Sequence, residues 1–364
     1  MSEPTVEEVV SLVSSTFEVK AIGRTVDLLQ FKIEDDNVKS KFVKLAQTLE
    51  ERNLVCKLES TPEGLFVLVR RFPPRKQRRW LSKSWTPRLL FAVVVAFVMI
   101  DGYYRTLGTN AIIEIGDPLE MAGIYTLSLL GILGIHEAGH LVASKWHKLK
   151  TTWPYFIPGI PVYGIPTFGA FIQSRGLTVN REILFDVAIA GPIAGLVITI
   201  LVSIYGAYTA PVIPMEMAEQ LYEEARLIEW SQGEPLLLTA SLAMFGKGGP
   251  GQEVLLTPVL FAAWIGFLIT FLNMLPAWQL DGGHMARTLF GEKLHRYLTY
   301  ASMGILVLLG YWIMAMFILV LSSRNPGAQP LDDISPLPKN RKIAYIAIII
   351  LAILCAPLPS SFLS

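Results

Sequence analysis

Long apolar runs separated by short polar segments dominate the sequence from about residue 89 onward. Most of them approach the length of about 20 residues that a helix needs to cross the hydrocarbon core of a bilayer. The pattern therefore predicts a polytopic, all-α membrane protein with about six transmembrane helices. The six runs are Leu89–Tyr104, Gly123–Trp146, Ile183–Tyr208, Leu255–Leu275, Leu298–Leu321 and Ile343–Pro357.

Residues 1–72 lack such runs and show the shorter periodicities of a small soluble domain. Helical spacing and strand-like alternation both occur, with a turn between the last two strands. The range contains no histidine and no glycine-rich phosphate loop. We therefore expect a cytosolic α/β accessory domain, on which a regulatory partner would act, with no catalytic role. Its predicted elements are Val6–Phe17, Thr25–Lys32, Val38–Glu51, Leu54–Glu59 and Leu65–Arg70.

Composition supports a membrane protein, because 52% of the 364 residues are hydrophobic and only 17% are charged. The two cysteines, Cys56 and Cys355, lie near opposite ends of the chain, so neither a disulfide nor a cysteine metal site is expected. The net charge of +1 excludes little. The distribution of charge along the chain is more informative.

A basic, proline-containing linker, residues 73–88, precedes the first apolar run. A nucleic-acid patch is one interpretation, but the position favours an anchor on anionic lipid, so no nucleic-acid partner is expected. We expect a multi-pass protein of the cell membrane. By the positive-inside rule its N-terminus is predicted to lie in the cytoplasm. The same scheme makes residues 323–364 an external loop and a C-terminal transmembrane helix. There Lys339, Arg341 and Lys342 conflict with the rule.

The second apolar run contains the motif His136-Glu137-Ala138-Gly139-His140. On a helix His136 and His140 lie one turn apart on one face, so both imidazoles can bind one metal ion. Glu137 lies beside them, in position to act as a general base on water. H-E-x-x-H is a zinc-protease signature, here inside a membrane-spanning run near its cytoplasmic end.

A catalytic zinc site needs a third protein ligand. The fourth apolar run is followed by Asp281, two glycines and His284. A carboxylate at membrane depth is unfavourable and is by default a functional group with a partner. Asp281 is therefore predicted as the third ligand. His284 is the alternative ligand and is otherwise expected beside the site.

Residues 151–180 are rich in proline and glycine and yet apolar, so they cannot form a spanning helix. Irregular backbone at membrane depth is tolerated only against protein or a water-filled cavity. Weak alternation over Thr167–Gln173 favours a strand. We expect a re-entrant loop or β-hairpin beside the active site. An ordinary cytosolic loop is the alternative.

Two motifs together carry a family resemblance. H-E-x-x-H in the second run, followed by N-x-x-P-x-x-x-L-D-G from Asn273 to Gly282, resembles the site-2 protease family of intramembrane zinc metalloproteases. The resemblance covers about Leu89–Leu321, and residues 89–322 are expected to form the protease core. Ala190–Gly195 resembles the glycine-proline packing motif of the family. The N-terminal domain resembles the larger archaeal, cyanobacterial and plastid-type members, and no inserted PDZ-like domain is found.

The resemblance implies a role for each motif residue. His136, His140 and Asp281 would bind one zinc ion per chain, and Glu137 would activate water and pass its proton to the leaving amine. Asn273 would donate a hydrogen bond to the substrate carbonyl or developing oxyanion. A helix–helix hydrogen bond is the alternative for Asn273. The small residues of the third run are expected to serve packing alone.

A helical substrate hides its carbonyls in hydrogen bonds and must unwind before attack. The predicted hairpin resembles the membrane-associated hairpin of the family and would bind the unwound strand by β-augmentation. Its predicted substrate-binding residues are Thr167, Phe168, Gly169, Ala170, Phe171 and Ile172.

The sequence thus predicts a membrane-embedded zinc endopeptidase that acts in regulated intramembrane proteolysis. It would hydrolyse peptide bonds within or next to transmembrane segments of membrane proteins, so its partners are such substrates and the lipid bilayer. A catalytically silent scaffold or chaperone is an alternative, disfavoured by the presence of Glu137 and all the ligands. A zinc transporter is a further alternative, disfavoured because the sequence shows no internal repeat.

Overall fold

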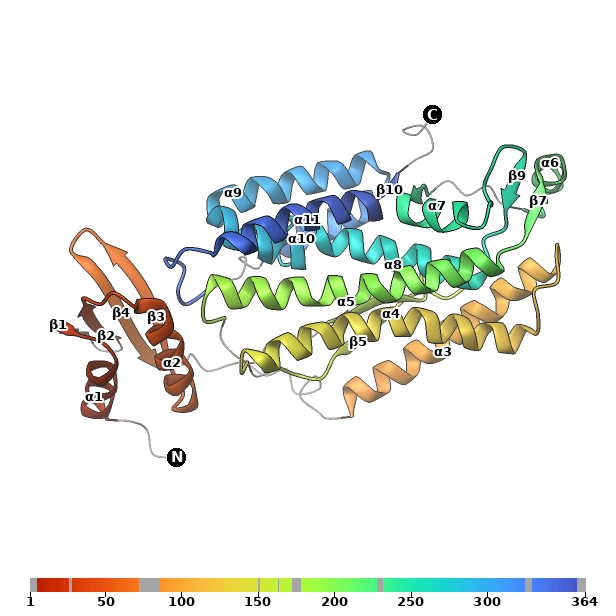
Figure 1. The fold of residues 1–364 in the computed structure, drawn as a ribbon. Coiled ribbons are helices and arrows are strands. Elements are labelled where there is room, and N and C mark those ends of the chain that lie inside the picture. Colours follow the sequence, from red (N-terminus) through yellow and green to blue (C-terminus); the bar gives the residue numbers. More distant parts are fainter. Residues whose placement is uncertain are drawn as a thin grey trace.

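The computed structural model of the protein describes residues 5–25, 28–71, 85–149, 151–162, 164–171, 178–227, 232–324 and 329–358. A small sheet with two helices lies at one end of the molecule, and an elongated bundle of helices forms the rest (Figure 1). The basic linker predicted over residues 73–88 lies outside the described residues up to position 84.

The N-terminal part is an antiparallel sheet of strand order β1-β2-β4-β3 with two helices packed on it. The expected hairpin is present as β3–β4, and Gly64 has a φ of +132° at its turn. The pattern missed β1, because most of its residues are exposed and show no alternation. The elements are α1 (Val6–Thr16), β1 (Val19–Arg24), β2 (Leu28–Ile33), α2 (Val38–Glu51), β3 (Leu54–Thr61) and β4 (Gly64–Arg71).

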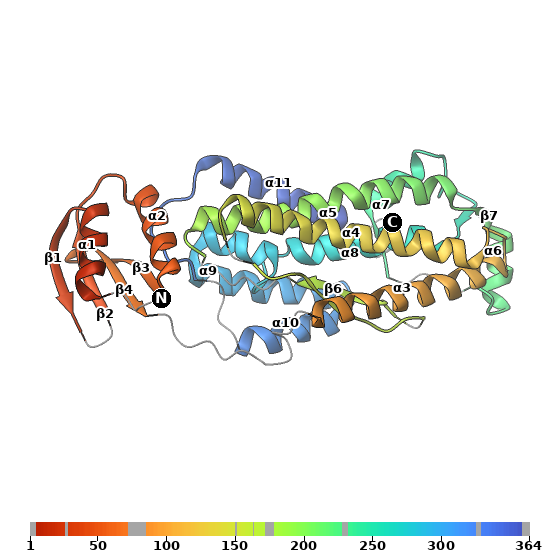
Figure 2. The ribbon, with the colours of Figure 1, turned by 90° about the horizontal axis from the view of Figure 1, so that it is seen from below.

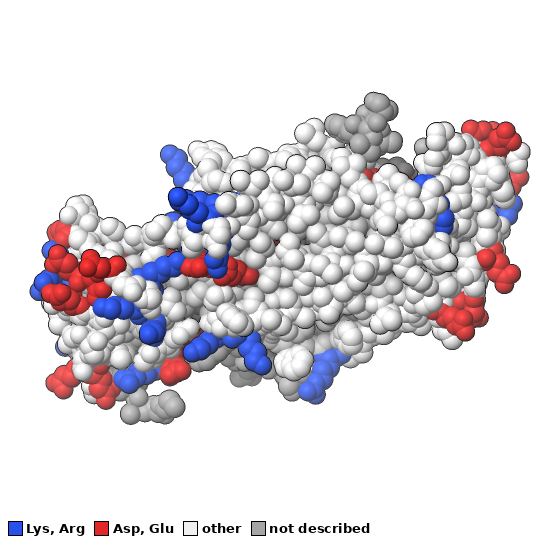
Figure 3. Space-filling view, viewed as in Figure 1, with Lys and Arg blue, Asp and Glu red and all other residues white. Residues whose placement is uncertain are grey.

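Three helices in the described part of the chain are long and apolar enough to cross a membrane: α3 (Thr86–Asn110), α4 (Pro118–Trp146) and α5 (Arg181–Thr209). They pack side by side, and the middle of the face that they form is largely uncharged, with charged side chains gathered toward the two ends (Figure 3). The apolar helix α8 (Pro258–Met274) is shorter. The protein is therefore mostly helical, with a membrane-protein distribution of charge.

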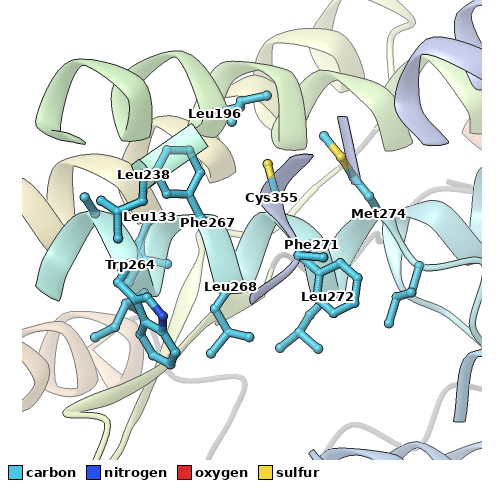
Figure 4. Close-up of a cluster of buried hydrophobic side chains, with 14 of the residues drawn as sticks. Leu133, Leu196, Leu238, Trp264, Phe267, Leu268, Phe271, Leu272, Met274 and Cys355 are labelled. Carbon is cyan, nitrogen blue, oxygen red and sulfur yellow. The ribbon is translucent and has the colours of Figure 1, made fainter. Parts of the chain in front are cut away.

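Helix α8 lies at the centre of the bundle, and nearly all of its side chains are buried. A helix that is apolar on every face belongs inside a core. Its residues Phe267, Phe271 and Met274 pack against α4, α5 and α11 in one continuous cluster (Figure 4). This burial fixes the end of α8, from which the chain continues to Asp281.

The connection from α5 to α8 forms a small cap at the end of the bundle far from the N-terminal sheet (Figure 1). Ser203 of α5 donates a hydrogen bond to Ser241 at 2.9 Å, which ties the cap to the bundle. The cap contributes acidic residues to the end of the molecule at which Figure 3 shows acidic side chains gathered. Its elements are β7 (Val212–Pro214), α6 (Met215–Glu223), β8 (Glu234–Pro235), α7 (Leu236–Ala243) and β9 (Gln252–Val254).

The prediction of one helix over Leu298–Leu321 is wrong. Helix α9 (Asp281–Leu308), which is interrupted by the non-helical backbone of Gly291 (φ +76°), ends at Leu308, and α10 (Trp312–Arg324) begins after a turn. Gly310 has a φ of +86°, and the Tyr311 amide donates back to the Leu306 carbonyl at 2.7 Å, which is a helix C-terminal turn. The two helices pack against each other, and α10 runs back toward the N-terminal sheet (Figure 2).

This reversal brings the segment after α10, which was predicted on the side opposite the N-terminal domain, to that domain's end of the molecule. The Leu58 amide of β3 donates to the Leu331 carbonyl at 2.8 Å, and the Leu331 amide donates to Thr178 at 2.9 Å. Helix α11 (Lys339–Cys355) therefore starts at the N-terminal domain's end, and its Arg341 pairs with Asp186 of α5 at 2.9 Å. The basic residues at its start therefore lie at the same end of the molecule as the N-terminal sheet. Strand β10 (Pro357–Leu358) follows and pairs with β8.

Candidate metal centre

Three side chains from two distant parts of the sequence converge inside the bundle. His136 Nε2 lies 3.2 Å from His140 Nε2, and both lie close to Asp281 Oδ2, at 3.4 and 3.3 Å respectively. All three are mostly buried. Among the described residues this is the group of histidine, cysteine and carboxylate side chains that could hold a metal ion.

The spacing of these atoms fits zinc. Ligand atoms about 2.0–2.1 Å from a tetrahedral zinc ion are separated from one another by about 3.3 Å. The three observed separations lie between 3.2 and 3.4 Å. Two imidazole nitrogens and one carboxylate oxygen are also a known catalytic donor set, which leaves the fourth position for water or substrate.

Helix α5 makes the space in which the two imidazoles lie. A Cβ at Gly191 would lie 2.1 Å from His140 Nε2, and one at Gly195 would lie 3.0 Å from the Cβ of His136. The glycines thus let α4 and α5 approach each other at the site, which goes beyond the packing role expected from the sequence. His140 Nδ1 lies 2.8 Å from the Val187 carbonyl. That contact makes Nδ1 the donor and leaves Nε2 as a lone-pair ligand.

Asp281 reaches the site because the chain turns sharply after α8. Trp278 has a φ of +43°, and its amide donates to Thr299 Oγ1 at 3.0 Å, which holds the turn against α9. Asp281 is the first residue of α9. Gly282 and Gly283 follow it and lie against the end of α8. A Cβ on Gly282 would lie 2.1 Å from the Met274 carbonyl oxygen, and one on Gly283 would lie 2.4 Å from the Ala277 carbonyl oxygen. The aspartate-glycine-glycine sequence therefore lets Asp281 approach the histidines.

The other predicted site residues lie beside this group. Glu137 follows His136 on α4 and is buried. Asn273 Nδ2 of α8 lies 3.5 Å from His136 Nε2, so the amide faces the metal centre. The alternative ligand His284 is not part of the cluster. Its Nδ1 is buried and has no hydrogen-bond partner among the described residues.

The proline-rich segment contains the expected β-hairpin, formed by β5 (Tyr155–Pro158) and β6 (Thr167–Phe171). Tyr155 pairs with Phe171 and Pro158 with Thr167, and the hairpin packs against α3 and α4 (Figure 2). Strand β6 consists of five of the six predicted substrate-binding residues: Thr167, Phe168, Gly169, Ala170 and Phe171. The sixth predicted substrate-binding residue, Ile172, lies outside the described residues.

The fold places this candidate metal centre within a bundle of apolar helices. Residues 124–317, more than half of the 364-residue chain, match the family model described as Peptidase family M50. The chain belongs to this family, that of the site-2 proteases, and the resemblance inferred from the sequence is confirmed.

Three relatives show the same relationship. The chain is 28% identical over 293 residues to the "Probable zinc metalloprotease EGY2, chloroplastic" of Oryza sativa subsp. indica. The aligned region covers 77% of this chain and 51% of that protein. It is 29% identical over 241 residues to the protein so described in Arabidopsis thaliana, covering 64% and 41%. It is 31% identical over 238 residues to the "Probable zinc metalloprotease EGY1, chloroplastic" of Arabidopsis thaliana, covering 64% and 42%.

The chain spans about half the length of the curated relatives that it matches. No solved structure matches it.

Proposed function

We propose that the protein is an intramembrane zinc endopeptidase that hydrolyses peptide bonds within or next to the transmembrane segments of other proteins. The observation that carries this proposal is the triangle of His136, His140 and Asp281 atoms, 3.2–3.4 Å apart, with Glu137 adjacent on the same apolar helix. Membership of the M50 family supports the same activity.

His136, His140 and Asp281 would hold zinc, which would polarise the scissile carbonyl and lower the pKa of water in the site. The Val187 carbonyl orients the His140 ring and keeps its Nε2 available as a ligand. Glu137 accepts a proton from the attacking water and delivers it to the leaving amine. Asn273 donates a hydrogen bond from Nδ2 to the carbonyl oxygen, where negative charge develops in the transition state.

The substrate binds as an extended strand on β6. Among the described residues β6 pairs with β5 alone, so no described strand hydrogen-bonds to the backbone groups along its second edge. An unwound transmembrane segment satisfies those groups by β-augmentation, and Thr167, Gly169 and Ala170 lie along that strand. The hairpin contacts α4, which carries the ligands, so a strand added there lies near the metal centre.

The proposed topology follows from the reversal at Gly310. The N-terminal sheet, residues 329–338 and the basic start of α11 lie at one end, which we assign to the cytoplasm by the positive-inside rule. The acidic cap between α5 and α8 lies on the other side. Helices α3, α4, α5, α8 and α11 cross between the two ends, and α9 and α10 enter and leave from the cytoplasmic side. The cell membrane remains the expected location.

A cleavage assay with purified protein tests the activity. Full-length protein is reconstituted with zinc in vesicles that contain a labelled single-span substrate, and the products are mapped by mass spectrometry. We expect cleavage within or next to the span by the wild type and none by Glu137→Gln, although both bind zinc. Equal cleavage by the two proteins, or none by either against a panel of spans, contradicts the proposal. An inert wild type that still binds zinc would favour the silent-scaffold alternative.

A further inference from the structure

Two charged side chains lie on α3 among the apolar residues of the bundle. Asp101 is fully buried, and Arg105, one turn later, donates a hydrogen bond from Nε to Asp101 Oδ2 at 2.7 Å. Ionisable residues inside transmembrane helices are unfavourable and as a rule have a function and a partner. The metal centre uses neither residue. Tyr125, which contacts Asp101, precedes His136 by eleven residues, about 16 Å along α4.

Both side chains reach the hairpin tip, defined here as the described residues 159–162 and 164–166 between β5 and β6. Asp101 Oδ1 accepts a hydrogen bond from the Val162 amide at 2.8 Å, and Arg105 Nη2 donates one to the Gly164 carbonyl at 3.3 Å. Each side chain also has a partner in the bundle. Tyr125 Oη donates to Asp101 Oδ2 at 2.8 Å, and the Arg105 guanidinium lies 3.6 Å from the centroid of the Phe261 ring. The ion pair therefore connects the tip to α3, α4 and α8.

The backbone of the tip depends on this connection. Val162 has a φ of +71°, a conformation that β-branched residues rarely adopt and that is stable only when its surroundings enforce it. The hydrogen bond that Asp101 accepts comes from the amide of Val162 itself. Beyond it, Ile160 and Ile165 pair through a 2.9 Å backbone hydrogen bond that continues the hairpin ladder. Release of Val162 would thus loosen the tip next to the first residue of β6, Thr167.

We propose that Asp101 and Arg105 form an intramembrane anchor that holds the hairpin in the register in which β6 presents substrate to the metal centre. They are positioning residues, because they touch the tip and neither the ligands nor the reacting atoms. A slip of one residue in a β-ladder turns every side chain to the other face, so the register decides which peptide bond reaches the metal centre. The inference rests on the proposed function, since it concerns the strand on which substrate binds.

The test compares the wild type with Asp101→Asn, with the double variant Asp101→Asn/Val162→Gly, and with Glu120→Gln as a matched loss of an exposed carboxylate on α4. Kinetics are measured on one transmembrane substrate in vesicles. A hydrogen bond to a charged group contributes enough to change an equilibrium about 10- to 100-fold. We expect Asp101→Asn to lower kcat/KM by about that factor, mainly through KM, with zinc content unchanged. Glu120→Gln should match the wild type.

The double variant separates positioning from a general structural role. Glycine adopts positive φ without strain, so Val162→Gly should restore much of the lost kcat/KM without the anchor. A bundle weakened by loss of the charge would not be rescued by a change in the tip. Wild-type kinetics in Asp101→Asn, or an equal loss in the single and double variants, overturns the proposal.

Hydrogen exchange gives a readout that does not depend on cleavage. We expect amides of residues 155–171 to exchange faster in Asp101→Asn than in the wild type, while those of α4 stay unchanged. Unchanged exchange in the hairpin overturns the anchor even if activity falls. If the wild type cleaves no substrate but the exchange result is obtained, the proposed function fails and the anchor stands.

Discussion

Gly191 on α5 lies so close to His140 on α4 that a Cβ built on it would be 2.1 Å from the ligand nitrogen Nε2. A methyl group at this position must displace the imidazole or separate the two helices. The metal centre therefore depends on a residue with no side chain and no chemistry of its own. A neighbouring turn repeats the arrangement, with Gly195 against His136.

Gly191→Ala should lose zinc while the protein remains folded. Overpacking in a close-packed interior destabilises by about 1–3 kcal/mol, which a helical bundle of this size tolerates. We expect zinc per chain and cleavage to fall together, as measured by atomic absorption and the vesicle assay. Gly134→Ala is the control, because a Cβ there meets no atom within 4 Å. Zinc bound normally by Gly191→Ala would show that the site does not need this close approach.

Gly282→Ala should displace Asp281 without touching the histidines. The added Cβ would lie 2.1 Å from the Met274 carbonyl, and backbone gives way less readily than a side chain. The start of α9 must then move away from α8 and take the carboxylate with it. We expect weaker zinc affinity, read by competition with a chelator. Gly304→Ala, also on α9 and with open space around it, should match the wild type.

The side on which residues 329–340 lie can be measured by labelling single cysteines in sealed vesicles. Cysteines introduced at Asn340, at Lys57 in β3 and at Glu219 in α6 are all exposed, and Cys56 and Cys355 are replaced by serine. We expect a membrane-impermeant reagent to label Asn340→Cys and Lys57→Cys from one side and Glu219→Cys from the other. Labelling of Asn340→Cys from the same side as Glu219→Cys would contradict this topology and favour one continuous span over Leu298–Leu321.

The segment 329–338 is held by ion pairs of Asp333 with Arg287 and Arg181. Burial tends to raise the pKa of Asp333, but hydrogen bonds from Arg287 and Arg181 outweigh it and hold the pKa below its ordinary value. The contribution of Asp333 to stability is therefore fully present above that ordinary pKa, near 3.9, and is lost only as the pH falls through the lower folded value.

Acidification from pH 7 to pH 5 should accordingly leave this segment protected from hydrogen exchange, after correction for the intrinsic rate. Asp333→Asn should raise its exchange at both pH values, because Arg287 and Arg181 lose their charged partner. Loss of protection in the wild type at pH 5 would mean that another group holds the segment.

The sequence could predict which side chains meet at the candidate metal centre because their chemistry is local. Two histidines four residues apart on a helix share a face whatever surrounds them, and an aspartate beside an apolar run needs a partner. The hairpin was predictable for a related reason, since prolines and glycines exclude a helix over residues 151–180. Helix ends were harder to predict from the sequence, since α3 extends beyond the predicted Leu89–Tyr104 at both ends.

Two features could not be read from the pattern because they depend on tertiary packing. A single glycine inside an apolar run is compatible with a continuous span, and only the left-handed φ of Gly310 shows the reversal between α9 and α10. Gly191 and Gly195 match any small-residue packing stripe, and their role becomes visible only when α5 is placed against His136 and His140. Asp101 lies within the first predicted apolar run, and its partners in the hairpin tip lie about 60 residues away in sequence.

The central claim is that His136, His140 and Asp281 together bind the catalytic zinc. Zinc per chain in purified Asp281→Ala and His284→Ala, measured beside the wild type, tests it most directly. We predict about one ion per chain in the wild type and in His284→Ala, and a loss in Asp281→Ala, because catalytic zinc takes three protein ligands. Full zinc content in Asp281→Ala, or its loss in His284→Ala alone, would contradict the account.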